Sequence, residues 1–278
     1  MERNLDLATR RCAVAIVLMA YYRGEAHLAS SLSVIDGLIA VLNFVDKGES
    51  SSKHRIFLSK GHAAPALYAA LAEFGIIEPE ELLTFNTPMT RLGIHPSRTL
   101  LPEVEYSSGS LGHGLAIAAG VALGNRLRGN DSFAFAVLGD GETNEGSIWE
   151  GAMFAANQNL TNLVVLVDHN KVQSVARYEE VAGGYSIANK FKAFGWEAIT
   201  LPGNNVNLIF EELNRFSNES QRIKPLAIIL DSTAGARVSC MENQVLWHYR
   251  RPNDQEFYLA MRELDAANIA PDLLEIFS

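Results

Sequence analysis

The chain has 278 residues, of which 48% are hydrophobic and 20% are charged, an ordinary balance for a globular protein. Its net charge of −9 argues against a nucleic-acid-binding surface, which needs a basic face. Two cysteines, Cys12 and Cys240, are too few for a disulfide framework, so we expect reduced thiols in a cytoplasmic protein.

The first predicted element is a helix over residues 5–23. Residues 12–22 form an apolar run that is too short to span a bilayer. Glu2 and Asp6 precede this run, and Arg23-Gly24-Glu25 follows it without the small-residue cleavage site of a signal peptide. The run therefore predicts a buried or interface helix, with no membrane association.

A second helix is expected over residues 32–45, where Ser30-Ser31-Leu32-Ser33 offers an N-cap. A third helix over 63–74 ends at Gly75, because glycine commonly follows the last turn of a helix. Residues 84–106 are rich in proline, arginine and histidine and therefore predict a loop.

Helices and strands alternate along the rest of the chain. The strand predicted over 133–138 shows no polar alternation, which fits burial on both faces of a parallel sheet. The order of elements predicts one doubly wound α/β domain over residues 1–278, undivided by any linker or composition shift. Further helices are predicted over 111–127, 148–157, 208–216, 257–264 and 271–277, with another ending at 191–194. Further strands are predicted over 163–168, 197–201 and 226–231.

Two of the predicted strands end in a residue with a side-chain oxygen. Asp140 follows the first within Gly139-Asp140-Gly141-Glu142, and Asn170 follows the second. About 30 residues separate them, the length of one βαβ unit, and ligands gather at the carboxyl ends of parallel strands. A carboxylate and an amide oxygen suit a hard cation such as Mg²⁺, and the flanking glycines let backbone approach a phosphate. Alone, the two residues would equally fit a turn aspartate and a capping asparagine.

Seven motifs in order resemble the amino-terminal half of transketolases, which are thiamine diphosphate enzymes. The resemblance covers residues 27–253, most of the chain. Besides the unit of Asp140 and Asn170, the motifs are Gly24-Glu25-Ala26-His27, Phe57-Leu58-Ser59-Lys60-Gly61-His62-Ala63, Gly93-Ile94-His95-Pro96, Ser107-Ser108-Gly109-Ser110-Leu111-Gly112-His113-Gly114, Val238-Ser239-Cys240-Met241-Glu242-Asn243 and Trp247-His248.

The resemblance implies a thiamine diphosphate-binding fold that holds the cofactor through Mg²⁺, or through Ca²⁺ or Mn²⁺. Asp140, Asn170 and the backbone oxygen of Val172 would bind the metal ion. The resemblance also places His62 beside the diphosphate and Leu111 against the cofactor rings. The other cofactor-binding residues that it implies are Gly109, Ser110, Gly139, Gly141 and Glu142.

The same resemblance places His27, His95 and His248 around the reacting carbons of a sugar. Neutral imidazole donates and accepts hydrogen bonds, so it can bind hydroxyl groups and move protons. A lone histidine is more often structural, but Ser59-Lys60-Gly61 before His62 and Trp247 before His248 match the family as blocks, whereas the His-Pro pair at His95 occurs in many loops. Glu145 is the fourth residue expected to act in catalysis. The resemblance places it at a subunit interface, in a hydrogen-bonded path that joins the two active sites of a dimer. A glutamate at a helix start is also favourable with the helix dipole.

Two segments depart from the family pattern. His113 stands where glutamine is usual, and an imidazole near a diphosphate can acquire charge. Thr233-Ala234-Gly235-Ala236-Arg237 replaces a segment richer in lysine and glycine, and alanine at 236 restricts backbone angles that glycine would allow. Since this loop precedes His248, an altered donor pocket is expected, and the identity of the sugar stays open.

None of these motifs belongs to the family's pyrimidine-binding domain. In the family, that domain supplies the glutamate that bonds the aminopyrimidine ring and the arginines that hold the sugar phosphate. We therefore expect the N-terminal subunit of a split transketolase, which acts on sugar phosphates with a separate C-terminal subunit in a two-fold assembly. A truncated protein is the alternative, although Ile276-Phe277-Ser278 after a helix reads as a natural terminus.

Two other functions stay open on the sequence alone. The donor could be pyruvate or another 2-oxo acid, as in the 2-oxo acid dehydrogenases or the deoxyxylulose phosphate synthase. The former are not expected to carry Ser59-Lys60-Gly61-His62-Ala63, and the latter is normally one long chain. The chain could also be a non-catalytic partner subunit. Loss of the metal ligands would indicate that role, and Asp140 and Asn170 are both present.

Overall fold

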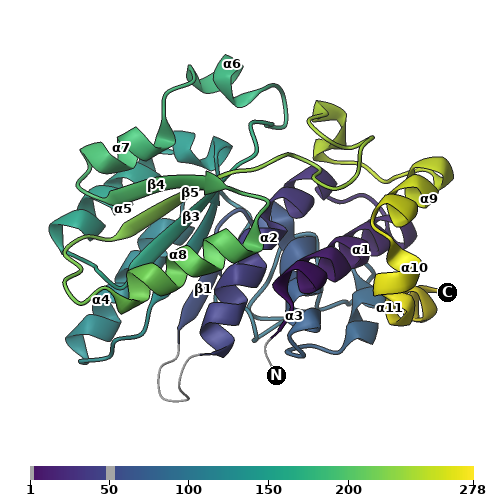
Figure 1. Ribbon diagram of the computed structural model, residues 1–278, viewed down its shortest axis with the longest axis horizontal. Helices are drawn as coiled ribbons and strands as arrows, with labels where there is room; N and C mark the ends of the chain where they lie inside the picture. Colours follow the sequence, from purple (N-terminus) through teal and green to yellow (C-terminus); the bar gives the residue numbers. More distant parts are fainter. Residues whose placement is uncertain (1–2, 48–53) are drawn as a thin grey trace.

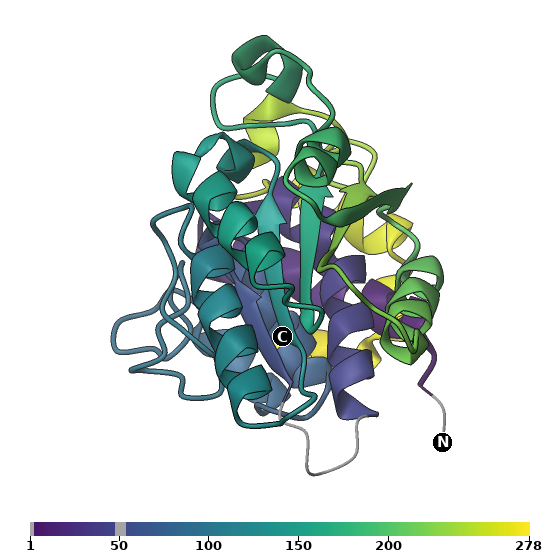
Figure 2. The same cartoon turned by 90° about the vertical axis from the view of Figure 1, so that its left-hand side faces the viewer.

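The computed structural model describes residues 3–47 and 54–278 (Figure 1). Its centre is a sheet of five parallel strands in the order β1-β2-β3-β5-β4. The strands are β1 (Arg55–Leu58), β2 (Ala134–Gly139), β3 (Leu163–His169), β4 (Glu197–Pro202) and β5 (Leu226–Asp231). Helices cover both faces of the sheet (Figure 2), so the predicted doubly wound α/β fold is confirmed.

Alternate side chains of each strand enter two separate hydrophobic cores. In β2, Phe135 and Val137 pack toward one group of helices, whereas Ala134, Ala136 and Leu138 pack toward the other. This period of two explains why the strand sequences are apolar throughout. The first core contains α1 (Leu5–Arg23), α2 (Leu28–Asp46), α3 (Ala64–Glu73) and α8 (Val206–Asn218). The second contains α4 (Gly114–Leu127), α5 (Gly146–Asn157) and α7 (Ile187–Ala193).

Helix α1 is the buried helix that the sequence predicted over 5–23. It packs against α2 and α3, and α9 (Asp254–Glu263), α10 (Ala266–Ile269) and α11 (Pro271–Phe277) cover its outer side (Figure 1). Among the described residues, only α2 is long and apolar enough to cross a membrane. Because 89% of that apolar window is buried inside the fold, α2 has the surroundings of a core helix.

The predicted N-cap of α2 is wrong. The helix begins at Leu28, with His27 at the N-cap position, so the serines lie inside the helix and are buried. Serine favours caps through local hydrogen bonds to backbone, but tertiary partners can replace these. Here the Ser30 hydroxyl lies 2.9 Å from His62 Nε2, and the Ser33 hydroxyl donates to Asp168 at 2.6 Å.

Most other predicted elements are found within a few residues of their expected bounds. Helix α4 begins at Gly114 rather than 111, because Gly112 adopts a left-handed φ of 88° that no helix contains. Residues 85–113 contain only turns and bends, as predicted for a loop over 84–106. The sequence analysis missed β1, α6 (Tyr178–Ala182) and the short α10.

Candidate functional site

A cavity of about 300 Å³ lies where β2 and β3 end, at the carboxyl edge of the sheet. Most of the predicted site residues line it: His27, His62, His95, His248, Gly109, Leu111, Gly139, Asp140, Gly141, Glu142, Asn170 and Val172. Four further residues line it that the sequence analysis did not assign: Ser30, Lys60, Gln173 and Ser174. The two residues that follow the predicted strands, Asp140 and Asn170, therefore both line the cavity.

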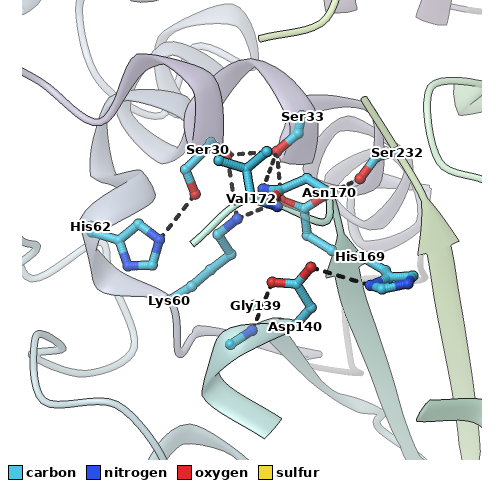
Figure 3. A network of polar contacts seen from close by, with 12 residues as sticks. Ser30, Ser33, Lys60, His62, Gly139, Asp140, His169, Asn170, Val172 and Ser232 are labelled. Carbon is cyan, nitrogen blue, oxygen red and sulfur yellow. Dashed lines mark hydrogen bonds and ion pairs between the residues drawn. The ribbon is translucent and has the colours of Figure 1, made fainter. Parts of the chain in front are cut away.

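Asp140 is held in place by backbone and imidazole donors. Its Oδ1 accepts the amide hydrogen of Gly141 at 2.7 Å, and its Oδ2 accepts that of Lys171 at 2.8 Å. His169 Nδ1 lies 3.2 Å from the same Oδ2 (Figure 3). The carboxylate is 4% exposed and points from the end of β2 toward the end of β3. Its orientation is therefore fixed by three contacts, none of them from a lysine or arginine side chain.

Asn170 is equally constrained, and its amide has a defined orientation. Its Nδ2 donates to Asp168 Oδ2 and to Ser33 Oγ, both at 3.1 Å. Its Oδ1 accepts the Val172 amide hydrogen at 3.0 Å. Lys171 adopts a left-handed φ of 67°, which turns the backbone so that the Val172 amide can reach the Asn170 side chain. The nitrogen of the amide is thus turned toward Asp168, and the oxygen is turned the other way.

The donor set suits a hard divalent cation. A carboxylate, a side-chain amide oxygen and a backbone carbonyl are all oxygen ligands, which Mg²⁺ and Ca²⁺ prefer. Within residues 3–47 and 54–278, no cluster of three or more His, Cys, Asp or Glu side chains is arranged to hold a metal ion. The protein ligands alone would leave a coordination sphere incomplete, so oxygens from a bound anion or water must complete it. Mg²⁺ is commonly held in this way, by one or two carboxylates together with phosphate oxygens.

Lys60 is a buried cation beside this site. Its ammonium group lies 2.5 Å from Asp168 Oδ2 and 3.3 Å from the Ser30 carbonyl oxygen, and the side chain is 1% exposed. Lys60 belongs to Ser59-Lys60-Gly61-His62, a motif already singled out in the sequence. Only its burial and its buried partner distinguish it from an ordinary surface lysine. These are tertiary features that a single sequence does not display.

Four histidines from distant parts of the chain meet in the cavity. The ring centroid of His27 lies 5.1 Å from that of His62, 6.2 Å from that of His95 and 5.3 Å from that of His248. His27 caps α2, His62 lies in a short 3₁₀ helix, His95 in the long loop and His248 at the end of another 3₁₀ helix. The resemblance placed His62 beside the diphosphate and the other three around the sugar, and the fold brings all four together.

Burial keeps these imidazoles neutral. It lowers the pKa of His27 to about 3, with further lowering from His248, His95 and Lys60. Burial is also the first cause that lowers the pKa of His62, followed by the charge of Lys60. The pKa values of His95 and His248 are lowered by burial as well. At neutral pH the cluster therefore presents neutral rings, each with one donor and one acceptor nitrogen.

Two polar atoms at the cavity have no hydrogen-bond partner among the described residues. They are His27 Nδ1 and Gln173 Nε2, and both are buried. An unpaired buried polar atom costs free energy, so such atoms mark places where a ligand or water completes the hydrogen bonding. His62 differs, because its Nε2 lies 2.9 Å from the Ser30 hydroxyl. The Nδ1 atom of His27 is therefore available to a ligand.

Glu142 is turned toward the surrounding loops. Its carboxyl group accepts hydrogen bonds from the Ser59 hydroxyl, from the Gly112 amide at 2.8 Å and from the Gly139 amide at 3.2 Å. Burial raises the pKa of this carboxyl group. Glu142 thus ties together the ends of β1 and β2 and the glycine-rich segment before α4, so that Gly139 and Leu111 reach the cavity from fixed positions.

Two predicted site residues do not line the cavity. Ser110 is exposed beside it, and Glu145 is exposed at the N-cap of α5. His113, one of the departures from the family pattern, is also exposed and outside the cavity lining. An exposed position for Glu145 is compatible with an interface, but it keeps the carboxylate away from a ligand in this cavity.

The second segment that departs from the family pattern, residues 233–237, adopts left-handed backbone angles on both sides of Ala236 but not at Ala236 itself. Gly235 and Arg237 have left-handed φ values of 70° and 75°, and the neighbouring alanine does not. Arg237 is anchored by two hydrogen bonds to the buried Asp36 of α2, at 2.7 and 2.9 Å. The Gly235 amide bonds the Ala29 carbonyl at 3.0 Å, so the loop packs directly on the start of α2. The backbone at residue 236 therefore does not use the left-handed angles that alanine disfavours.

Comparison with known proteins gives concordant matches. Residues 43–256 match the family model for the thiamine diphosphate-binding domain of transketolase. A putative uncharacterized transketolase family protein of Sinorhizobium fredii is 34% identical, over 95% of this chain and 96% of the relative. One subunit of the apulose-4-phosphate transketolase of Actinobacillus succinogenes is 33% identical, over 90% of this chain and 91% of the relative. The crystal structure of transketolase from Campylobacter jejuni superposes with a TM-score of 0.84 at 22% identity. The match covers 100% of this chain but 46% of that one.

Proposed function

Because the chain belongs to the transketolase family and matches its thiamine diphosphate-binding domain, we propose that it is the N-terminal subunit of a split transketolase. Its reaction is transfer of a two-carbon ketol group from a ketose phosphate donor to an aldose acceptor. The observation that carries this proposal is the meeting of four neutral histidines with Asp140 and Asn170 around one cavity.

Bound thiamine diphosphate would supply a nucleophilic carbon, the thiazolium C2, to which a two-carbon unit can be attached. Asp140, Asn170 and the Val172 carbonyl would hold Mg²⁺, or Ca²⁺ or Mn²⁺, and the metal ion would hold the diphosphate. Among the described residues, no lysine or arginine side chain pairs with Asp140, which supports this assignment because a metal ion could then balance its charge. Gly139 and Gly141 leave room for close approach. His62, Gly109 and Leu111 complete the lining of the proposed cofactor site, Ser110 lies beside it, and the buried Glu142 holds Gly139 through its amide.

The histidines would hold the sugar. A ketose presents hydroxyl groups beside its carbonyl, and neutral imidazoles can donate to them and accept from them. The unpartnered Nδ1 of His27 offers one such contact, and the ring centroids of His95 and His248 lie 6.2 and 5.3 Å from that of His27. These rings can also take up and return a proton at the reacting hydroxyl. Pyruvate carries no hydroxyl on its two-carbon unit and would leave these nitrogens unused.

A separate C-terminal subunit would close the cavity. The relative from Actinobacillus succinogenes is named as one subunit of a transketolase, and this chain covers most of its length. Large apolar side chains are exposed next to residues that line the cavity: Val175, which follows Ser174, is 79% exposed, and Leu246, two residues before His248, is 69% exposed. Figure 2 shows the strands pointing toward this end of the molecule, where α6 and its loops stand out. A partner that covers these side chains would bury apolar surface and exclude water from the reaction.

Self-association into a two-fold assembly is proposed through α4 and α5. Their outer faces expose Ile117, Met153 and Phe154 together with the small residues Ala116 and Gly120. Small residues let a second copy approach closely, and closed two-fold symmetry is the commonest arrangement of oligomers. Glu145 lies at the start of α5, where such an interface would include it.

We propose a cytoplasmic location for the assembly and one cofactor-binding domain over residues 1–278.

Product analysis of the assembled complex tests the proposed reaction. The complex is supplied with thiamine diphosphate, Mg²⁺ and an aldose acceptor, and either a ketose phosphate or pyruvate as donor. We expect a product two carbons longer than the acceptor with the ketose phosphate alone. Carbon dioxide release from pyruvate, without transfer from any ketose phosphate, would refute the ketol-transfer proposal.

A further inference from the structure

Asp168 is a buried carboxylate at the end of β3, with four donors around it (Figure 3). Its Oδ2 accepts from Lys60 Nζ at 2.5 Å, from Ser33 Oγ at 2.6 Å and from Asn170 Nδ2 at 3.1 Å. Its Oδ1 accepts from the Ser232 hydroxyl. The side chain is 0% exposed and does not line the cavity, so it cannot itself contact a bound ligand.

This carboxylate decides which end of the Asn170 amide faces the cavity. An ionised carboxylate accepts hydrogen bonds and donates none, so only the NH₂ end of Asn170 can face it. The oxygen end must then point away from Asp168, where it accepts one backbone hydrogen bond, from Val172. Were the amide reversed, two oxygens would face each other in a buried site. The oxygen that a cation requires is therefore presented because of Asp168.

Lys60 pairs with Asp168 inside the fold. A fully buried carboxylate is costly without a compensating charge. The ammonium group of Lys60 supplies that charge and is itself 1% exposed. Ser33 links the two side chains, because its hydroxyl donates to Asp168 and accepts from Asn170.

We propose that Asp168 is a positioning residue for the bound cation, which acts by fixing the Asn170 amide with its oxygen toward the cavity. The inference rests on the proposed cofactor and extends it to a residue that touches neither metal ion nor cofactor. Residues that hold metal ligands in this way typically affect metal affinity by about ten- to a hundredfold.

The test measures Mn²⁺ binding by electron paramagnetic resonance, with thiamine diphosphate at saturation and the full chain assembled with its partner. We expect Asp168→Asn to weaken Mn²⁺ binding by about ten- to a hundredfold. Ser232→Ala removes one hydrogen bond and leaves the ion pair intact, so it should weaken binding less. Ser132→Ala is the matched control, because Ser132 is a buried serine bonded to Asn130 at the opposite end of β2. It should leave Mn²⁺ affinity unchanged.

Exchanging the side chains of residues 168 and 170 distinguishes a positioning role of Asp168 from a general loss of folding stability. In Asp168→Asn combined with Asn170→Asp, the amide at 168 can donate to the carboxylate at 170. The other carboxylate oxygen then faces the cavity whichever way the side chain turns. The double variant should recover most of the Mn²⁺ affinity that Asp168→Asn loses. A residue that merely supports the fold would give no such recovery.

Two results would overturn the inference. One is an Asp168→Asn complex, or a Ser232→Ala complex should the former not fold, that binds Mn²⁺ as tightly as wild type. The other is a double variant that binds no tighter than Asp168→Asn. A wild-type complex that binds neither Mn²⁺ nor thiamine diphosphate would instead refute the cofactor proposal, and this inference with it.

Discussion

The imidazole rings of His27 and His248 lie 5.3 Å apart between centroids and stand almost perpendicular, at 89°, on the lining of one cavity. His27 precedes the first turn of α2, and His248 ends a 3₁₀ helix near the other end of the chain. Crossed rings at this spacing direct their nitrogens to different points. A polyhydroxylated ligand between them can therefore be held by more than one hydroxyl group.

Replacing either of these histidines should impair transfer without impairing cofactor binding. For His27→Ala and His248→Ala we expect ketol transfer to fall by about 10² to 10⁴, the usual cost of losing a positioned proton-transfer group. Thiamine diphosphate affinity should stay near that of wild type, because neither ring holds the proposed metal ligands. Steady-state transfer rates and cofactor titrations on the assembled complex measure both quantities.

His113→Gln serves as the control for that pair, since His113 is exposed and outside the cavity lining. It should change neither the transfer rate nor cofactor affinity. If the His27 and His248 variants transfer from every native donor at near-normal rates, the sugar-binding role is wrong. A 2-oxo acid donor would then be favoured.

Asp140→Ala should abolish cation-dependent cofactor binding. The substitution removes the carboxylate that the Gly141 and Lys171 amides and His169 hold in place. Isothermal titration with thiamine diphosphate and Mg²⁺ should show no heat of binding at concentrations that saturate wild type. Asp131→Ala, at an exposed aspartate near the opposite end of β2, should bind normally. Unchanged affinity in Asp140→Ala would remove this residue from the metal site.

The free energy of unfolding should fall as the solution is acidified from pH 6.5 toward pH 3. The pKa of His27 is about 3 in the folded chain, lowered from 6.5 mainly by burial. Between these values the unfolded chain binds a proton that the folded chain does not, so stability rises with pH. Each such proton changes the free energy of unfolding by about 1.4 kcal/mol per pH unit. In thermal melts from pH 7 to pH 4, the melting temperature of His27→Gln should fall less with acidification than that of wild type. An equal fall of melting temperature with pH in both proteins would contradict the pKa assigned to His27.

Removing Lys60 should destabilise the chain more than removing the whole ion pair. Lys60→Met leaves Asp168 as a buried, uncompensated charge, and breaking such a pair typically costs about 3–5 kcal/mol. Lys60→Met combined with Asp168→Asn removes both charges and should recover part of that loss. Urea unfolding of the two variants measures the difference. A double variant less stable than Lys60→Met would show that the pair is not coupled as described.

The sequence predicted the residues that follow from strand ends and from adjoining blocks, such as Asp140 and His62. Both lie on the cavity, because strand direction determines where parallel strands end. It did not predict β1, which has four residues and begins with the half-buried Arg55 and Ile56. So short a strand gives almost no periodic signal, and its place at the sheet depends on pairing with β2.

The buried supports of the site were missed for a different reason. Ser30 and Ser33 have the composition of a helix cap, and only the approach of His62 and Asp168 gives their hydroxyl groups hydrogen-bond partners inside the helix. Lys60 and Asp168 are ordinary charged residues until the fold buries them together. These contacts join residues far apart in the chain, and local patterns carry no information about them.

The most direct test of the account measures ketol transfer by the purified chain alone and after addition of its C-terminal partner. Both assays contain thiamine diphosphate, Mg²⁺, a ketose phosphate donor and an aldose acceptor. This chain alone should show no enzyme-like turnover, because no partner then completes its cavity, and turnover should appear once the partner is added. Enzyme-like transfer by the chain without any partner would contradict the split transketolase.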